Sequence, residues 1–285
     1  MLADHDHILY EYLERETSSA IHARFRGFSG YVQADAKSVF NVLFADAEEL
    51  RQKSTSLEHD GCERVECGCW YHARRRFWGA AVTKHEVGRQ GLVRLRRIFE
   101  LDASWKKKPP AEIRKLRELH LMPHIVSFFE WVDQQRPIYQ DQRGLVRTAL
   151  EYVHNQRQAL TRFFEDGRLV LTNSGAERAL KTVAIGRRAW LFCGSDDHAK
   201  STGALYSVVA SARLHRLDPE EYLRCIIRLV PLWPQDRLLE LAPLFWEHTR
   251  ARLDPSQLAA EFGPIDIPVE PLELSTTAQQ QSPAN

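Results

Sequence analysis

The chain has 285 residues, 44% of them hydrophobic, which is enough to bury a sizeable core and excludes disorder as the main state. Its 39 Lys and Arg nearly balance 38 Asp and Glu, so the composition as a whole predicts no strong attraction to nucleic acid, membranes or acidic ligands. Thirty of the 39 cations are arginines, whose planar fork pairs with phosphates and carboxylates at two points. This bias is the only sign of phosphate chemistry in the composition.

The cysteines and the first residues indicate a reducing compartment. Five cysteines, three of them within residues 62–69, make an odd number that does not fit a framework of disulfides. No run approaches the roughly 18 apolar residues of a spanning helix, and the start of the chain lacks the basic and apolar regions of a signal peptide. We expect a cytoplasmic protein without a membrane partner.

In the first seventy residues, segments with two different spacings of apolar residues follow one another. A period of two is typical of strands, and a three-and-four spacing of apolar residues is typical of helices. Thr17 or Ser18 is placed to cap a helix that Gly27 would end. The pattern predicts a strand over residues 7–14, a helix over 17–25, a strand over 30–35, a helix over 36–47 and a strand over 64–70.

The next hundred residues or so are helical in period and rich in arginine. Prolines are expected to divide this stretch, from about residue 74 to 167, into several helices: Pro109, Pro110, Pro123 and Pro137. A short apolar run at 169–172 then leads to predicted helices over 173–188, 197–215 and 219–229. Asp218 is expected to cap the last of these, with Pro219 in its first position. The order of elements predicts an α/β core interrupted by a helical insertion.

Two carboxylates stand out by their positions. Asp35 follows a predicted strand at the edge where open α/β sheets collect ligands, but it could equally cap the helix expected after it. Glu177 lies in a Ser-x-x-Glu pattern with Ser174, which is the capping box of a helix N-terminus. Helix capping can therefore explain why both carboxylates are present, without any functional role.

Clusters of cations indicate contact with a polyanion. Residues 71–99 contain eight Lys and Arg and one acid, and a second group of cations follows Glu177. A solvated helix face is the alternative. The residues expected to bind DNA phosphates are Arg74, Arg75, Arg76, Arg178, Lys181, Arg187 and Arg188.

A third pattern has the spacing of metal ligands. Cys62, Cys67, Cys69 and His72 lie within eleven residues, and Cys69-x-x-His72 is a spacing at which a thiolate and an imidazole reach one zinc ion. The alternative is that Cys67 and Cys69 pack as small hydrophobes on a buried strand.

Three long blocks, at residues 30–43, 67–78 and 163–223, together resemble the catalytic domain of transposases of the insertion-sequence-66 type. The resemblance implies a ribonuclease-H-like mixed sheet interrupted by a large all-helical insertion, and a DDE carboxylate triad. It places the second Asp of the triad on Asp35 and the Glu on Glu177, as ligands of Mg²⁺ or Mn²⁺. Further matches are the block Cys69-Trp70-Tyr71-His72, the segments 186–188 and 190–192, and 241–243 with Trp246.

The match departs from the family at two places. Asn173-Ser174 stands where the family has two asparagines. The family's first catalytic Asp lies on a strand upstream of the residues seen here, so we expect a core whose first strand is missing. The resemblance divides the chain into a first part of the core (1–73), a basic helical insertion (74–166), a return to the core with the catalytic Glu helix (167–232) and a C-terminal extension with a polar tail (233–285).

The resemblance implies metal-dependent DNA cleavage and strand transfer in the bacterial cytoplasm, associated with the nucleoid. Its partner would be double-stranded DNA at transposon ends. Because the first Asp is expected to be missing, we predict DNA binding with weak or no cleavage. The alternative is a non-catalytic DNA-binding or oligomerisation remnant of a transposase, which would pair with its own copies or with a full-length transposase.

Overall fold

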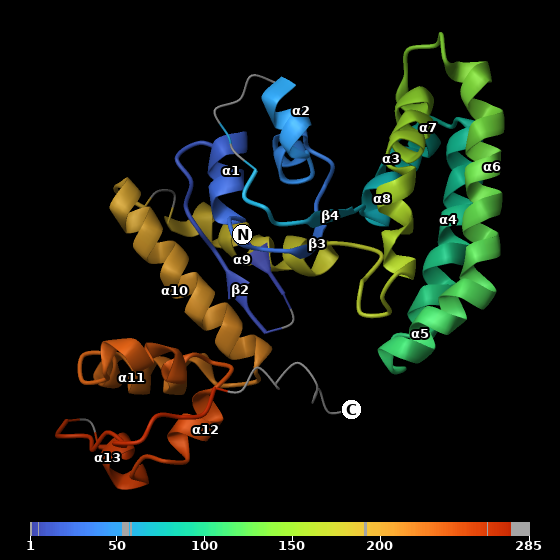
Figure 1. The fold of residues 1–285 in the computed structure, drawn as a ribbon. Coiled ribbons are helices and arrows are strands. Elements are labelled where there is room, and N and C mark those ends of the chain that lie inside the picture. Colours follow the sequence, from blue (N-terminus) through green and yellow to red (C-terminus); the bar gives the residue numbers. More distant parts are fainter. Residues whose placement is uncertain are drawn as a thin grey trace. The chain divides into compact units, whose positions relative to one another are not determined.

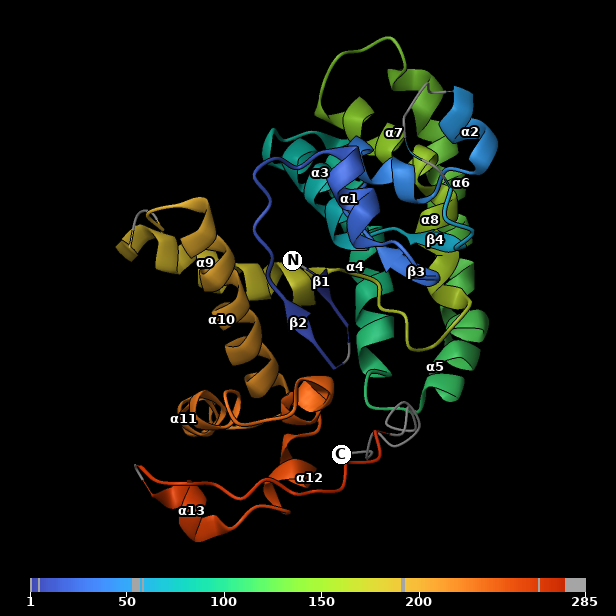
Figure 2. The same ribbon diagram turned by 60° about the vertical axis from the view of Figure 1, so that its left-hand side comes forward.

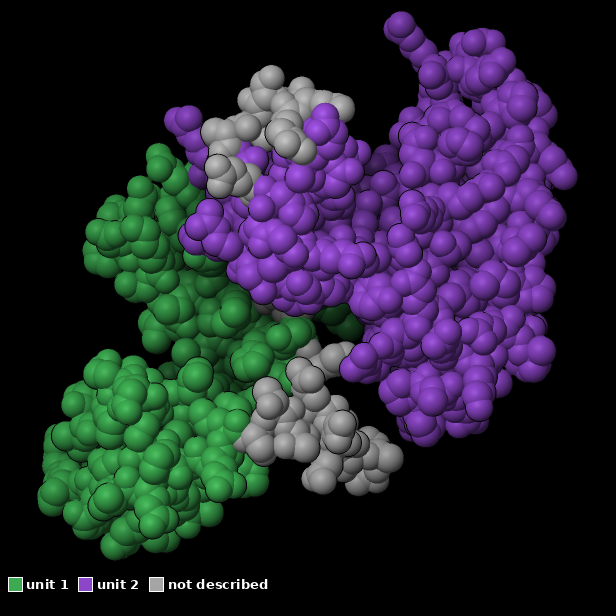
Figure 3. All heavy atoms as spheres, viewed as in Figure 1, with its two compact units in different colours: residues 1–14, 175–283 green, residues 15–174, 284–285 purple. Residues whose placement is uncertain are grey.

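A computed structural model describes residues 2–4, 6–52, 57, 59–190, 193–260 and 262–274. The chain divides into two compact units, shown in different colours in Figure 3. Unit 1 consists of residues 1–14 and 175–283, and unit 2 contains residues 15–174. The two units are described separately below.

Unit 2 begins with a small parallel sheet and its flanking helices. Thr17 caps the first helix by accepting a hydrogen bond from the backbone N–H of Ala20, and Gly27, with φ of +78°, lies in the turn after it. The two strands pair in parallel with Val32 opposite Glu66. The elements are α1 (Ser18–Arg24), β3 (Gly30–Gln33), the 3-10 helix η1 (Ser38–Leu43), α2 (Ala47–Gln52) and β4 (Arg64–Cys67) (Figure 1).

Two of the elements predicted in this region differ from the prediction. The helix expected over residues 36–47 is a 3-10 helix followed by the separate helix α2. Ala36, two residues before this 3-10 helix, has φ of +58°, a left-handed conformation that an α-helix does not contain. The strand expected over 64–70 ends at Cys67, because Trp70 is already the first residue of helix α3 (Trp70–Val82).

The rest of unit 2 is helical, as the sequence predicts. Pro110 and Pro123 lie in first helical turns, where no backbone N–H is needed. Pro137 does not divide the chain as predicted, because it lies in the last turn of α6, where its missing N–H breaks only a terminal hydrogen bond. The elements after α3 are α4 (Glu86–Ser104), α5 (Pro110–Leu116), the π-helical turn η2 (Arg117–Leu121), α6 (Met122–Tyr139), α7 (Leu145–Asn155), α8 (Arg157–Thr161) and the 3-10 helix η3 (Arg162–Phe164).

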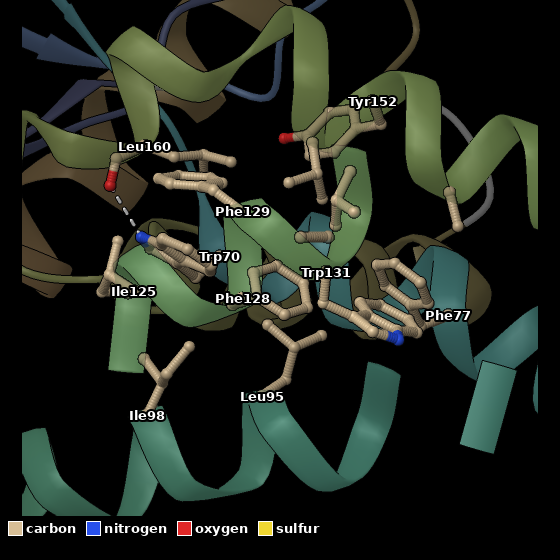
Figure 4. Close-up of a cluster of buried hydrophobic side chains, with 14 of the residues drawn as sticks. Trp70, Phe77, Leu95, Ile98, Ile125, Phe128, Phe129, Trp131, Tyr152 and Leu160 are labelled. Atoms are coloured by element: carbon tan, nitrogen blue, oxygen red, sulfur yellow. Dashed lines mark hydrogen bonds between the residues drawn. The ribbon is translucent and has the colours of Figure 1, made fainter. Parts of the chain in front are cut away.

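These helices enclose an aromatic core around Trp70 (Figure 4). Trp70 is fully buried and donates its indole N–H to the carbonyl of Leu160 at 2.8 Å. Gly91 lets helices α3 and α4 approach closely, because a Cβ atom there would lie 2.3 Å from the ring of Phe77. The buried surface of this cluster stabilises unit 2 and holds α3 and α7 together.

Unit 1 starts with an antiparallel hairpin, β1 (Leu2–Ala3) and β2 (Ile8–Leu9). The strand predicted over residues 7–14 is therefore much too long. The physical reason is that the backbone N–H groups of Ile8 and Tyr10 donate to the hydroxyls of Ser211 and Ser207 on helix α10, and not to a neighbouring strand. The helices of unit 1 are α9 (Ser174–Trp190), α10 (Asp196–Leu214), α11 (Pro219–Leu229), η4 (Gln235–Leu241), α12 (Trp246–Arg250) and α13 (Pro255–Ala259).

A second core lies in the C-terminal part of unit 1, around Tyr222, Leu229 and Trp246. The ion pair between Arg237 and Glu240 helps to hold the segment after α13 there. Arg237 pairs with the buried carboxylate of Glu240 and also donates to backbone carbonyls at residues 268–270. The same carboxylate accepts the backbone N–H of Leu272 at 3.0 Å.

The described residues form a mostly helical protein with two two-stranded sheets, a composition compatible with the predicted α/β class. The finer arrangement, a ribonuclease-H-like sheet, stays a prediction, and so does the division at residues 73, 166 and 232. No helix within the described ranges combines the length and the apolar character needed to cross a bilayer.

Candidate functional site

Asp35 lies two residues beyond the end of β3, at the carboxyl edge of the parallel pair. Its Oδ1 atom is buried and has no hydrogen-bond partner, and its Oδ2 atom lies 3.9 Å from Nζ of Lys37. It does not act as a helix cap, since the residue preceding η1 is Lys37 and that helix receives no side-chain cap. The capping alternative is therefore wrong for Asp35, and one oxygen of its carboxylate is buried without a hydrogen-bond partner.

The surroundings of Asp35 include residues that the sequence did not single out. The pKa of Tyr152 is raised mainly by burial, with further contributions from Cys69, Glu66 and Asp35 that outweigh the opposing effect of Arg76. The Tyr152 hydroxyl donates to the carbonyl of Cys69 at 3.4 Å. Burial also raises the pKa of Glu66 on β4, so its charged form would gain from a nearby cation. Two carboxylates thus influence one buried phenol.

Glu177 lies in the first turn of helix α9 and is half-buried. The helix begins at Ser174, whose hydroxyl lies 2.9 Å from that of Thr172. A carboxylate in the first turn complements the helix dipole. The capping box predicted for Ser174 and Glu177 stays a prediction. Glu177 belongs to unit 1 and Asp35 to unit 2, so a site shared by the two carboxylates stays a prediction.

Helix α9 carries its cations on the surface. None of its residues with a described side chain is buried, although it is 17 residues long. Arg178 and Lys181 are three residues apart and share a face, as predicted. The cations Arg178, Lys181, Arg187 and Arg188 are all exposed, and within the described part of the chain no acid forms an ion pair with any of them.

The three arginines of α3 are not equivalent. Arg74 and Arg75 are exposed, in agreement with a role toward an external polyanion. Arg76 is half-buried, and its guanidinium lies over the ring of Tyr152, 4.5 Å from the ring centroid. The sequence pattern predicts the same role for all three arginines. In the structure the packing of α3 on α7 places Arg76 against Tyr152, whereas Arg74 and Arg75 face solvent.

The cysteine and histidine cluster is held by packing. Cys67 and Cys69 are buried, and burial raises the pKa of Cys67 to about 12, so it is a neutral thiol at physiological pH. The thiol of Cys69 donates to Oδ1 of Asn173 at 3.0 Å. Among the residues that the structure describes, no group of three or more His, Cys, Asp or Glu is arranged to hold a metal ion. Zinc binding by Cys62, Cys67, Cys69 and His72 stays a prediction.

Two further segments that resemble the transposase family are described to different extents by the structure. Leu241 and Trp246 belong to the core of unit 1. Residues 191 and 192 of the predicted 190–192 block lie outside the described residues.

Comparison with known proteins adds two relatives from Sinorhizobium fredii (strain NBRC 101917 / NGR234). Uncharacterized protein y4hP is 29% identical over 247 residues, which make up 82% of this chain and 42% of that protein. Uncharacterized protein y4qI is 23% identical over 240 residues, with 83% of this chain and 42% of that protein covered. The chain thus spans about two fifths of the length of these curated relatives. No solved structure matches the chain.

The family comparison covers most of the candidate residues. The model of the family described as Transposase IS66 family matches residues 2–201. This is well over half of the chain, and it includes Asp35, Glu177 and all of the cations singled out above. The chain therefore belongs to the Transposase IS66 family.

Proposed function

We propose that this chain is part of a DDE-type DNA transposase and contributes Asp35 and Glu177 to its metal-dependent phosphoryl-transfer site. The observation that carries the proposal is the family match across residues 2–201, which contain both carboxylates. The orphaned oxygen of Asp35 at the end of β3 supports it. A ribonuclease-H-like core is part of the same proposal.

The chemistry of the donors fits Mg²⁺ or Mn²⁺ at Asp35. Hard divalent cations prefer carboxylate oxygens, and the buried Oδ1 atom lacks any donor that would otherwise compensate its charge. When bound, such an ion would polarise a DNA phosphate and favour attack by water or a 3′-hydroxyl. Asp35 and Glu177 would hold it, and the unpartnered oxygen of Asp35 would be one of its ligands.

The exposed cations would hold the DNA. Helix α9 presents Arg178, Lys181, Arg187 and Arg188, and α3 presents Arg74 and Arg75, without a pairing acid among the described residues. Each phosphate contact releases counterions, so the affinity should fall steeply with salt. Double-stranded DNA is the proposed partner, and the bacterial cytoplasm and nucleoid are the proposed location.

A manganese titration tests the carboxylate assignment without requiring activity. We expect the purified chain to bind one Mn²⁺ weakly, and Asp35→Asn to weaken that binding roughly tenfold or more. Asp141→Asn, which removes an exposed carboxylate elsewhere, should leave the binding unchanged. Unchanged Mn²⁺ affinity in Asp35→Asn would contradict the assignment, as would strong Mn²⁺-dependent plasmid nicking that survives this substitution.

A DNA titration separates the proposal from its alternative. Salt-dependent duplex binding without Mn²⁺ binding would favour a non-catalytic DNA-binding remnant, whose partners would be copies of itself or a full-length transposase. The exposed cations of α9 are the observation behind that second function.

A further inference from the structure

Unit 2 contains a concave site that the proposed function does not use. It has a volume of about 460 Å³ and lies where the start of α7 meets α3. Its lining residues are Arg76 from α3, Arg143 and Gly144 directly before α7, and Arg147, Thr148, Glu151 and Tyr152 along α7. Of these, the sequence pattern had singled out Arg76 alone.

The charge of this pocket is strongly positive. Three arginines line it against one acid, Glu151. That acid is already neutralised, since Arg136 donates from Nε and Nη2 to its two carboxylate oxygens at 3.2 Å each. Among the described residues no acid forms an ion pair with Arg76, Arg143 or Arg147. The pocket therefore holds uncompensated positive charge in a recess.

One of the three arginines is fixed in place. The guanidinium of Arg76 lies over the Tyr152 ring, and Tyr152 is buried and bonded to the carbonyl of Cys69. The Nε atom of Arg76 is buried without a partner, so only its terminal nitrogens remain to meet a ligand. A held arginine loses less conformational freedom on binding than an exposed one.

The backbone adds donors of the same kind. Helix α7 begins after Gly144 without a side-chain cap and without an acid in its first turn. The first N–H groups of a helix have no partners within it and attract anions. A Cβ atom on Gly144 would meet nothing within 4 Å, so the approach to these groups is open. The hydroxyl of Thr148 donates to the Gly144 carbonyl at 3.0 Å and can still accept a hydrogen bond.

We infer that this pocket, defined by Arg76, Arg143, Arg147 and the N-terminus of α7, binds a phosphate group. Planar guanidinium forks and helix N-terminal N–H groups both suit phosphate oxygens. Three unpaired arginines carry more positive charge than one carboxylate would balance, which favours phosphate over a carboxylate ligand. The source is a backbone phosphate of DNA or a free phosphate, and the choice of DNA rests on the proposed function.

Inorganic phosphate is the first probe. In thermal unfolding at constant ionic strength, exchanging chloride for phosphate should raise the Tm by about 3 °C at ten times the Kd. The variant Arg143→Gln/Arg147→Gln should lose this shift, and its Tm without phosphate should stay unchanged because both side chains are exposed. The charge-matched control Arg114→Gln/Arg224→Gln removes two exposed arginines outside the pocket and should keep the shift. Equal shifts in all three proteins would overturn the inference.

Duplex DNA is the second probe and identifies the source. If the pocket holds backbone phosphates, the double variant should lower the slope of log K against log salt by about 1 to 2, with the control unchanged. A lost phosphate shift with an unchanged DNA slope would assign the pocket to free phosphate. DNA binding by wild type, with neither a phosphate shift nor a slope change, would overturn the pocket while the proposed function stands. If the wild type does not bind DNA but keeps the phosphate shift, the proposed function is overturned while the phosphate pocket stands.

Discussion

Arg117 shows how one side chain can join distant parts of unit 2. Its side chain is 3% exposed, and its Nε donates to Oδ1 of Asp102 at 2.7 Å. Its Nη1 donates to the carbonyls of Phe163 and Leu169 at 2.9 and 2.8 Å. The guanidinium thus ties the π-helical turn to helix α4 and to the segment that leads toward α9.

Arg117→Met should be strongly destabilising, because it leaves a carboxylate and several carbonyls without their donor. We expect the free energy of unfolding to fall by about 3 kcal/mol in urea denaturation. Arg114→Met is the matched control, since Arg114 pairs with Glu118 on the surface at 3.2 Å, where a pair contributes about 1 kcal/mol or less. Similar losses in the two variants would contradict the structural role of Arg117.

Asp35 is the residue whose placement was most predictable. A carboxylate after a predicted strand is expected at the carboxyl edge of a sheet, and the structure has it two residues beyond β3. Neither the orphaned oxygen nor the influence of Asp35 and Glu66 on the pKa of Tyr152 could be predicted, since these residues are brought together only by packing.

At the scale of elements, helices with explicit caps were the most predictable. Helix α11 has the predicted cap and the predicted proline, with Asp218 accepting the N–H groups of Glu220 and Glu221 at 2.9 Å. The strand predicted over residues 7–14 is much shorter in the structure, because backbone N–H groups in this segment donate to serine hydroxyls on α10. A helix cap is a hydrogen bond between residues two or three positions apart, so the local sequence specifies it. A strand depends on the segment that packs beside it, which can be distant in the sequence.

Removing the cap of α11 should have a moderate effect on unit 1. Asp218→Ala should lower the free energy of unfolding by about 1 kcal/mol, because two N–H groups lose their acceptor. Asp218→Asn should retain most of the stability, since Asn is an equally good cap. Chemical denaturation followed by circular dichroism measures both. Glu220→Ala, which removes only an exposed pair with Arg224, is the control, and an equal loss there would argue against capping.

At the scale of the whole molecule, each unit has its own hydrophobic core. The cluster around Trp70 lies entirely within unit 2, and the cluster around Trp246 lies within unit 1. Figure 2 shows the helices and strands of both units from a second side. A unit with its own core has the main requirement for folding alone. The near-zero net charge is likewise an average, because residues 71–99 are strongly basic.

The fragment 15–174 should therefore fold by itself. We expect a cooperative thermal transition by circular dichroism and dispersed amide resonances by NMR. Trp70→Ala in the same fragment should destabilise it by about 3 to 5 kcal/mol, because it removes the central aromatic ring of the core. A gradual, non-cooperative melt of the fragment would show that its stability depends on the remainder of the chain.

The sequence by itself determined the local features of this protein: capped helices, the helical stretch from about residue 74, and the linear blocks that identify the family. These depend on contacts between residues a few positions apart, or on the order of residues alone. The tertiary structure alone decided which arginines are paired and which remain free. Arg117 is buried against Asp102, whereas Arg76 and Arg147 come from two different helices and line one pocket. Such differences arise from packing between distant segments, which periodicity and composition do not encode.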